Sequence, residues 1–390
     1  MGNFVGRSMQ QHAQIDITVH WDLAELREDW MTLQSAGATT LYQTYEWCHA
    51  WHDTIGMPNG VQAQIVAGHG TDGKIKFILP LATRQHGSYR IVEWLAAQIA
   101  TYGLGVYDPS FLAQSAQGLA PYWKAIVAAL PDADGIWLNH LPETWCGRPH
   151  PLGALFTTRS ANQTHQITLQ PNYAELYETK RSASSRRGAQ RRDKQLEAVG
   201  DVTFGLPASD ADAEQLIDEM IEQHARYLAV RGVHNVLDGG TADFLKQLTR
   251  LKSDSQVSIF PQYLHVDGKL VSAKLGFIFD RVYWAMISSL DAADLHRYSP
   301  GDYALRKTIA ACCERGLETF DFATGDSSYK DHWSDCSISL HEIIQARTAR
   351  GMLWAAAKRA SIDAKRVVKN SAFLWPKLTR FRKTALGHKS

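Results

Sequence analysis

The sequence predicts an α+β chain built from two similar halves, and three observations carry this prediction. The same order of elements is expected twice: a helix, an antiparallel run of strands, a second helix and a further strand. Two dipeptides that favour tight hairpins, Asp72-Gly73 and Asp267-Gly268, lie half the chain apart. The length of 390 residues also exceeds what one hydrophobic core usually organises, which favours two domains.

The first half is expected to begin with a strand and a helix. Residues 15–19 alternate between apolar and polar side chains, as in a half-buried strand. Asp22 can cap the helix that follows, and Glu25 stands three residues later, as in a capping box. The apolar residues of this helix recur at helical spacing and are Leu23, Leu26, Trp30 and Leu33.

A strand meander and a second helix are expected to complete the first half. Residues 61–67 and 74–83 read as strands joined through Asp72-Gly73. A helix over residues 121–130 then leads into a short buried strand over residues 136–138.

The second half repeats this order. Ser209 or Asp210 can cap a helix that Gly232 can end. Three strands are expected, over residues 257–266, 270–279 and 282–290. A helix over residues 303–313 and a strand over residues 319–322 complete the half.

The bulk composition indicates a globular protein without a structural metal. Hydrophobic residues make up 45% of the chain and charged residues 21%. No segment has the length and apolarity of a membrane span and the first residues lack the apolar core of a signal peptide, so we expect a cytoplasmic protein. The five cysteines are odd in number and have no CxxC spacing, which argues against disulfides and zinc. The group Cys48, His49, His52 and Asp53 lacks a second ligand pair, so we expect no metal.

The charge of the chain is unevenly distributed. The segment after Gln345 holds twelve basic residues and one acidic residue, a net charge of +11, which leaves −10 for the rest. Apolar residues such as Trp354, Phe373 and Trp375 stand among these basic residues. The pattern suits peripheral contact with the anionic inner face of a membrane, and equally a basic helix docked on the acidic body.

Several motifs in a fixed order resemble the CelD-type members of the GNAT superfamily. Ser299-Pro300-Gly301 opens a helix, Phe320-Asp321-Phe322 forms a strand, and Gly325-Asp326 with Tyr329-Lys330 and Trp333 follows. Residues 42–47 resemble the aromatic-Glu-Trp element of that family, and the basic stretch 180–194 resembles its Arg-rich helix. The resemblance covers residues 16–348.

The resemblance implies two tandem GNAT-like domains, each a mixed, mostly antiparallel sheet with flanking helices, related to the Fem-type transferases. We expect an N-terminal GNAT-like domain over residues 1–170, a C-terminal GNAT domain with the acyl-CoA site over 171–345, and a basic tail over 346–390. Acetyl-CoA or another acyl-CoA is the expected co-substrate. The sequence departs from the usual pyrophosphate signature, of which only Ser299-Pro300-Gly301 is left.

The expected donor site lies at the start of the helix over residues 303–313. Free amides at a helix N-terminus attract phosphate, so this turn can cradle the pyrophosphate of CoA. The same residues can also simply start a helix. The candidates are Ser299, Pro300, Gly301, Asp302 and Tyr303.

Three residues beyond the strand over 319–322 are candidates for chemistry. Asp326 can accept the proton of an amine, Tyr329 can protonate the departing thiolate, and Lys330 can bind phosphate or support the oxyanion. In the alternative, Asp326 caps a turn and Lys330 lies on a solvated surface. Asp321 is as compatible with a buried structural carboxylate as with a catalytic one.

Candidate acceptor contacts are Glu46, Trp47, Tyr102 and His224. Aromatic residues such as Trp47 more often form core than a platform for a sugar, and His224 ends an apolar helical stripe that suits a core histidine. The basic residues within 180–194 can contact CoA phosphates, nucleotide sugars or tRNA, or form a solvated face.

Taken with the resemblance, these residues predict an N-acyltransferase that moves an acetyl or other acyl group from acyl-CoA to an amine acceptor, such as a glycan precursor in polysaccharide or envelope biosynthesis. A Fem-type transferase using aminoacyl-tRNA is the alternative within enzymes, and it alone would bring a nucleic acid partner. A non-catalytic GNAT-fold protein of an envelope-assembly complex is the alternative outside enzymes.

Overall fold

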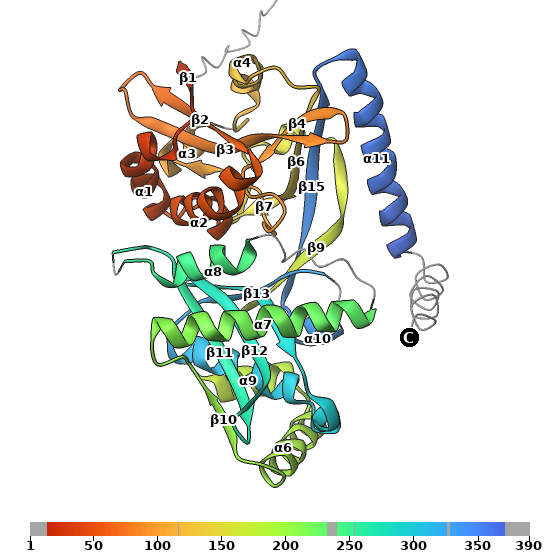
Figure 1. The fold of residues 1–390 in the computed structure, drawn as a ribbon. Helices are drawn as coiled ribbons and strands as arrows, with labels where there is room; N and C mark the ends of the chain where they lie inside the picture. The colour runs from red at the N-terminus through yellow and green to blue at the C-terminus, as the bar shows by residue number, and fades with distance from the viewer. Residues whose placement is uncertain (1–13, 116, 232–239, 253, 326–327, 371–390) are drawn as a thin grey trace, which may run out of the picture.

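The computed structural model describes residues 14–115, 117–231, 240–252, 254–325 and 328–370. Within these residues, thirteen strands form one sheet that runs through both halves of the molecule. Figure 1 shows two lobes, one above the other, joined by the long strands β9 and β15. The described residues hold no helix that is both long enough and apolar enough to cross a bilayer.

The strands are β1 (Ile15–His20), β2 (Gln62–Gly70), β3 (Ile75–His86), β4 (Tyr89–Trp94), β5 (Val106–Tyr107), β6 (Gly135–Pro142), β7 (Thr144–Trp145), β8 (Arg148–Pro149), β9 (Thr158–Thr168), β10 (Val202–Gly205), β11 (Ser258–Val266), β12 (Lys269–Phe279), β13 (Val282–Leu290), β14 (Thr319–Thr324) and β15 (Cys336–Ala346). The large sheet has the order β1-β2-β3-β4-β6-β15-β9-β14-β13-β12-β11-β10, with β5 beside β3. Strands β7 and β8 form a separate hairpin.

The α-helices are α1 (Arg27–Ser35), α2 (Tyr45–Trp51), α3 (Pro109–Gln114), α4 (Trp123–Ala129), α5 (Tyr173–Lys180), α6 (Ala183–Glu197), α7 (Asp210–Arg231), α8 (Thr241–Thr249), α9 (Pro300–Glu314), α10 (Ser328–Trp333) and α11 (Ala349–Asn370). Short 3-10 turns precede several of them.

The start of the first half differs from the expected capping box. The side chain of Asp22 accepts a hydrogen bond from the amide of Ala24 at 2.9 Å, so the predicted cap is present. A 3-10 turn over Leu23–Leu26 comes before α1, however. The carboxylate of Glu25 lies 2.6 Å from Nδ1 of His20 instead of returning to the cap, and the capping-box prediction is wrong. Because a 3-10 turn is wound more tightly than an α-helix, the side chain of Glu25 points in a different direction from that of a capping box.

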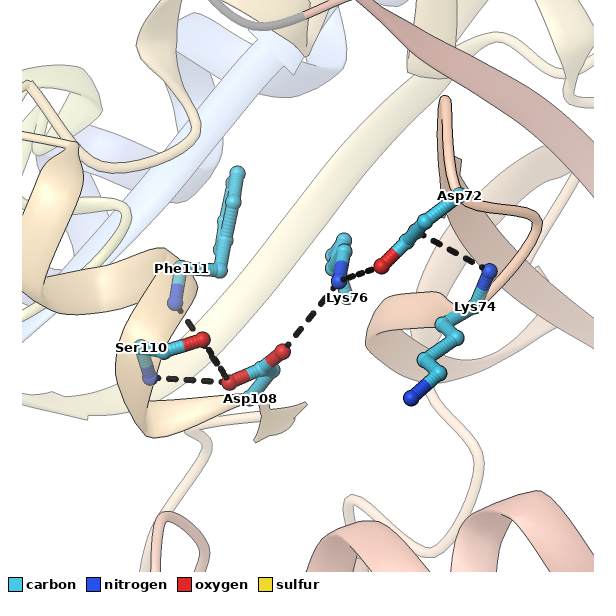
Figure 2. A network of polar contacts seen from close by, with 6 residues as sticks. All are labelled: Asp72, Lys74, Lys76, Asp108, Ser110 and Phe111. Carbon is cyan, nitrogen blue, oxygen red and sulfur yellow. Dashed lines mark hydrogen bonds and ion pairs between the residues drawn. The ribbon is translucent and has the colours of Figure 1, made fainter.

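The first Asp-Gly dipeptide forms the predicted hairpin, since β2 and β3 pair in antiparallel register on either side of it. Figure 2 shows how this turn is tied to α3. The ammonium group of Lys76 lies 2.8 Å from Asp72 and 3.5 Å from Asp108. Asp108 also caps α3 by accepting from the amide of Ser110 at 2.8 Å. One lysine therefore links the hairpin to the helix cap.

The second half follows the predicted order closely. Strands β11 and β12 pair through Asp267-Gly268, whose φ angles are both positive. Strand β13 has the predicted bounds, and α9 begins three residues before the expected start. Ser209 is the cap of α7, because its hydroxyl accepts from the amide of Asp212 at 3.2 Å. Gly232, the expected end of this helix, lies outside the described residues.

Two strands cross between the halves. Strand β9 ends the first half and pairs with β14 of the second, whereas β15 follows the second half and pairs with β6 of the first. The two crossing strands also pair with each other. The halves therefore share one sheet. The domain boundaries at 170/171 and 345/346 stay predictions.

An aromatic core joins the two halves. Trp145 stacks on Trp284 with ring centroids 5.9 Å apart, and Trp47 meets Phe244 and Phe277 edge-to-face at 4.9 and 5.3 Å. Each pair takes one ring from each half. Such contacts add to the free energy gained by burying large rings, so we expect the halves to behave as one body.

Helix α11, the described part of the basic tail, lies along β9 and β15 (Figure 1). Its basic side chains face the body: Arg359 donates to the carbonyl of Ile344, and Lys358 lies 3.3 Å from the ring centroid of Trp137. The outward face carries Leu353, which is 70% exposed. Of the two alternatives for the tail, α11 therefore has the docked arrangement. Membrane contact stays a prediction, and residues 371–390 lie outside the described residues.

Candidate functional site

The sheet of the second half has two differently covered faces. Tyr283 and Trp284 are neighbours on β13, so their side chains point to opposite faces. Tyr283 packs in the cluster that contains Leu305 of α9, whereas Trp284 packs in the cluster that contains Met220 of α7. Helices α9 and α7 therefore cover opposite faces, as Figure 1 also shows.

Strands β13 and β14 separate after a short contact. They pair in parallel only over residues 282–284 and 319–321, although β13 continues to Leu290. The edge of β13 beyond Trp284 is thus not paired with β14. An opening in a sheet exposes backbone groups that a ligand can use.

A β-bulge lies at the beginning of this opening. The register between β12 and β13 shifts at Leu275 and Gly276, and Met286 is the extra residue on β13. A bulge leaves its extra residue without a partner in the ladder and redirects the strand. The bulge therefore leaves Met286 without a partner in the β12–β13 ladder.

Helix α9 begins at the far end of β13, as the sequence predicts. Ser299 is its N-cap, with a left-handed φ of 56°, and Pro300 is the first helical residue. The carbonyl of Ser299 accepts from the amides of Asp302 and Tyr303 at 3.0 and 3.2 Å. The amides of Asp302 and Tyr303 are thus already used within the helix. Gly301 supplies the amide that a ligand can take.

A cavity of about 330 Å³ lies at this helix start. Its lining brings together residues from β12, β13, α9 and α10, namely Lys274, Ser288, Leu290, Gly301, Asp302, Leu305 and Tyr329. Three of the sequence-predicted site residues, Gly301, Asp302 and Tyr329, therefore meet in one place. Tyr303 is 7% exposed and packs with Ala304 beside the cavity.

Sequence reasoning missed Lys274 and Ser288, which face each other across β12 and β13. The ammonium group of Lys274 donates to the hydroxyl of Ser288. Burial lowers the pKa of Lys274 to about 8, and the carboxylate of Asp302 opposes this shift. The signal was present in the sequence, because Lys274 is the one charged residue within the apolar stretch Leu270–Phe279. The cavity thus contains a cation.

The acid in the first turn of α9 is balanced by a neighbouring arginine. Asp302 accepts from Nε of Arg306 at 3.0 Å, and the same guanidinium group holds both carboxylate oxygens of Asp193 on α6 at 2.6 and 2.9 Å. Such bidentate pairs are the strong form of an ion pair. The basic helix α6 is therefore anchored to the start of α9. The other basic residues of α6 bring additional positive charge to this region.

The three candidates for chemistry are placed differently. Tyr329 lines the cavity and is 42% exposed. Lys330 is 5% exposed and donates to the carbonyls of Ala323 and Thr324 at 3.3 and 2.7 Å, so it is not on a solvated surface. Its ammonium group supports the end of β14. Asp326 lies outside the described residues, and its role stays a prediction.

Asp321 and Tyr102 meet in a buried polar cluster between the halves. Oδ2 of Asp321 accepts from the phenol of Tyr102 at 2.6 Å and from Nε2 of Gln166 at 2.8 Å, and Oδ1 accepts from the amide of Ala323 at 2.6 Å. Burial raises the pKa of Asp321, although these bonds oppose it. Burial, together with the charge of Asp321, raises the pKa of Tyr102 well above its usual value.

The other acceptor candidates do not line this cavity. Glu46 accepts from the hydroxyl of Ser255 and from Gln34 at 2.9 and 2.7 Å, and Trp47 is fully buried. His224 lies on α7, and burial lowers its pKa, although the backbone of Ser288 on β13 opposes this shift. Trp47 and Tyr102 contact strands that border the cavity, through Phe277 on β12 and Trp284 on β13. The role of each in binding an acceptor stays a prediction.

Residues 183–331, which include the opening, the bulge and α9, match the family model of the acetyltransferase (GNAT) domain. This part of the chain therefore resembles a GNAT domain. The fold class expected from the sequence, α+β with mixed sheets and flanking helices of the GNAT type, is thereby confirmed. No curated protein sequence matches the chain.

Solved structures resemble the whole chain. The C-terminal domain of a proposed lysylphosphatidylglycerol synthetase from Agrobacterium fabrum has 12% identity and a TM-score of 0.51, covering 87% of this chain and 97% of that one. L-PGS from Bacillus licheniformis has 9% identity and the same TM-score and coverage. A tandem GNAT protein from the clavulanic acid pathway has 8% identity and a TM-score of 0.44, covering 85% and 98%. At these identities the first two show a shared fold and nothing further.

Proposed function

We propose that this protein is an N-acyltransferase that moves an acetyl or other acyl group from acyl-CoA to an amine, and that it is of the CelD-like type. The observation that carries the proposal is the cavity at the start of α9, where Gly301, Lys274 and Tyr329 meet. It combines a helix N-terminus, a cation and a phenol in a GNAT domain. A helix N-terminus and a cation favour phosphate binding, and a phenol can protonate a thiolate.

The start of α9 suits the pyrophosphate of the donor. The amide of Gly301 and the positive end of the helix dipole favour an anion there, and Lys274 adds a full charge. A Cβ added at Gly301 would lie 3.6 Å from the side chain of Leu290, which also lines the cavity. The missing side chain therefore leaves room for the backbone and a phosphate to approach each other.

The opening between β13 and β14 suits the thioester. The amine nitrogen attacks the thioester carbonyl, the C–N bond forms, and the negative charge collects on the carbonyl oxygen. The backbone amide at the Met286 bulge can donate to that oxygen. The C–S bond then breaks, the amine loses its proton to a base or water, and Tyr329 protonates the thiolate. Tyrosine has a reference pKa of about 10, above the 8.5 of a thiol, so the phenoxide then regains its proton from solvent.

The proposed acceptor is an amine on a glycan precursor of polysaccharide or envelope biosynthesis, and the proposed place of action is the cytoplasm. Acyl transfer can be measured as acetyl-CoA-dependent release of CoA thiol with a panel of amino sugars and nucleotide-linked amino sugars. We expect turnover with at least one member of this class. Turnover with aminoacyl-tRNA but not acetyl-CoA would establish the Fem-type alternative, and neither binding nor turnover of any donor would favour a non-catalytic protein.

A further inference from the structure

A second and larger cavity, of about 690 Å³, lies on the α7 side of the same half. Its volume is typical of a small-molecule site. Its walls come from α7, from the β11–β12 turn and from the chain after β13. The charged and polar residues that line it are Glu219, Glu222, Gln223, Arg226, Asp267, Lys269, Asp291 and Asp294.

The lining is acidic. Five carboxylates face two basic groups, and Arg226 is shared between Asp291 at 3.3 Å and Glu222 at 3.8 Å. Exposed pairs of this kind contribute little free energy and leave the negative potential of the cavity in place. Clefts lined mainly by one sign of charge concentrate ligands of the opposite sign. The cavity therefore favours a cation.

Gln223 gives a second and independent indication of a ligand. This side chain is 6% exposed and lines the cavity. Its Nε2 donates to the carbonyl of Leu270 at 2.9 Å, whereas its Oε1 has no hydrogen-bond partner among the described residues. A buried acceptor without a donor is unfavourable. An N–H group of a bound ligand would satisfy it.

The acidic cavity lies next to the proposed donor cavity. Leu290 borders the donor cavity, and the following residue, Asp291, borders the acidic one. Helix α7, which carries Gln223, packs against β13. The acidic cavity and the donor cavity thus share the end of β13 while opening on different helices.

We infer that the acidic cavity binds an ammonium group of the acceptor, so that the acceptor carries a second cationic nitrogen besides the amine that is acylated. This inference rests on the proposed function. Oε1 of Gln223 accepts one N–H of that ammonium group, and Asp291 and Asp294 balance its charge. A divalent metal ion is the other simple cation, but the described residues contain no group of three or more side chains arranged to hold one.

Calorimetry with 1,4-diaminobutane tests the inference without any need for turnover. We expect the diamine to bind about tenfold or more tightly than 1-aminobutane, with an affinity that falls as salt is added. Gln223→Leu and the pair Asp291→Asn and Asp294→Asn should each weaken the diamine about tenfold. Asp210→Asn removes one exposed charge from the start of α7, outside the cavity, and should leave binding unchanged.

The outcomes are distinct. No measurable diamine binding at low salt, equal binding of monoamine and diamine, or the same loss in Asp210→Asn as in the cavity variants would overturn the inference. Mg²⁺ binding that competes with the diamine and disappears in the cavity variants would also overturn it. Acetyl-CoA binding is measured separately on the same protein. Acetyl-CoA binding without diamine binding rejects this inference alone. Diamine binding without acetyl-CoA binding rejects the proposed function, and with it the identification of the bound cation as the acceptor.

Discussion

The phenol of Tyr102 donates a 2.6 Å hydrogen bond to the carboxylate of Asp321, 219 positions later in the chain. One residue belongs to the first half and the other to β14 of the second, where β13 and β14 begin to separate. The same phenol bonds Thr164 of the crossing strand β9 at 2.6 Å. This contact therefore fixes the position of the opening relative to the first half.

The first prediction concerns this contact. Tyr102→Phe leaves the buried carboxylate of Asp321 short of one donor and should lower the free energy of unfolding by about 1–3 kcal/mol. Asp321→Ala should do the same, and the double variant should cost less than the sum of the two. Urea unfolding of all four proteins gives the coupling energy. Strict additivity would mean that the bond does not join the halves energetically.

The second prediction concerns the cation of the donor cavity. Lys274→Met should weaken acetyl-CoA about ten- to hundredfold, because it removes a charged donor, whereas Lys274→Arg should keep most of the affinity. The pKa of Lys274 is lowered to about 8, so its charge is present below pH 8 and lost above it. Wild-type affinity should therefore fall as pH rises through 8. An affinity that is independent of pH and unchanged in Lys274→Met would contradict this role.

The third prediction concerns chemistry. Tyr329 is 42% exposed, so Tyr329→Phe should fold normally and lose about a hundredfold in turnover with little change in acetyl-CoA affinity. Tyr89→Phe, in the first half, is the matched control and should keep full turnover.

Asp326→Asn and Lys330→Ala are also expected to lose turnover. Lys330→Ala should unfold more easily as well, since its ammonium group holds two carbonyls. Wild-type rates in all three site variants would remove these residues from the mechanism.

The fourth prediction concerns pH and stability. His150 is buried, donates from Nε2 to the carbonyl of Gly103 and accepts at Nδ1 from the amide of Leu152. Burial lowers the pKa of His150 from 6.5 to about 4. The unfolded chain therefore binds the extra proton first, and stability should fall by about 3 kcal/mol as pH drops from 6.5 to 4. His150→Gln should show a shallower slope over that window, and equal slopes would show that another group is responsible.

The sequence predicted the elements whose signals are local. The Asp-Gly turns and the bounds of β13 follow from a few neighbouring residues and are present as predicted, and α9 is present but begins three residues earlier than expected. The exchange of β9 and β15 could not be predicted in this way, because its register joins segments such as Thr164 and Thr324 that lie far apart in the chain. No local pattern records that pairing.

The site was predicted in part for the same reason. Gly301, Asp302 and Tyr329 stand in recognisable motifs and meet in the donor cavity. Lys274 stands in a strand, and its role depends on Ser288 and α9 folding against it. Glu46, whose role as an acceptor contact stays a prediction, accepts from Ser255 and from the amide of Gln256, which ties the halves together. The local sequence around a residue does not show that its side chain will bridge two distant segments.

The affinity of the Gly301→Val protein for acetyl-CoA, measured by calorimetry beside the wild type, tests the central claim most directly. A Cβ at this position would meet only Leu290, at an ordinary contact distance, so we expect the protein to fold. Gly153→Val, in the first half and equally uncrowded, is the control. The account predicts that wild type and Gly153→Val bind acetyl-CoA alike, while Gly301→Val binds it at least tenfold more weakly. Equal affinity in a folded Gly301→Val protein would contradict a donor site at the start of α9.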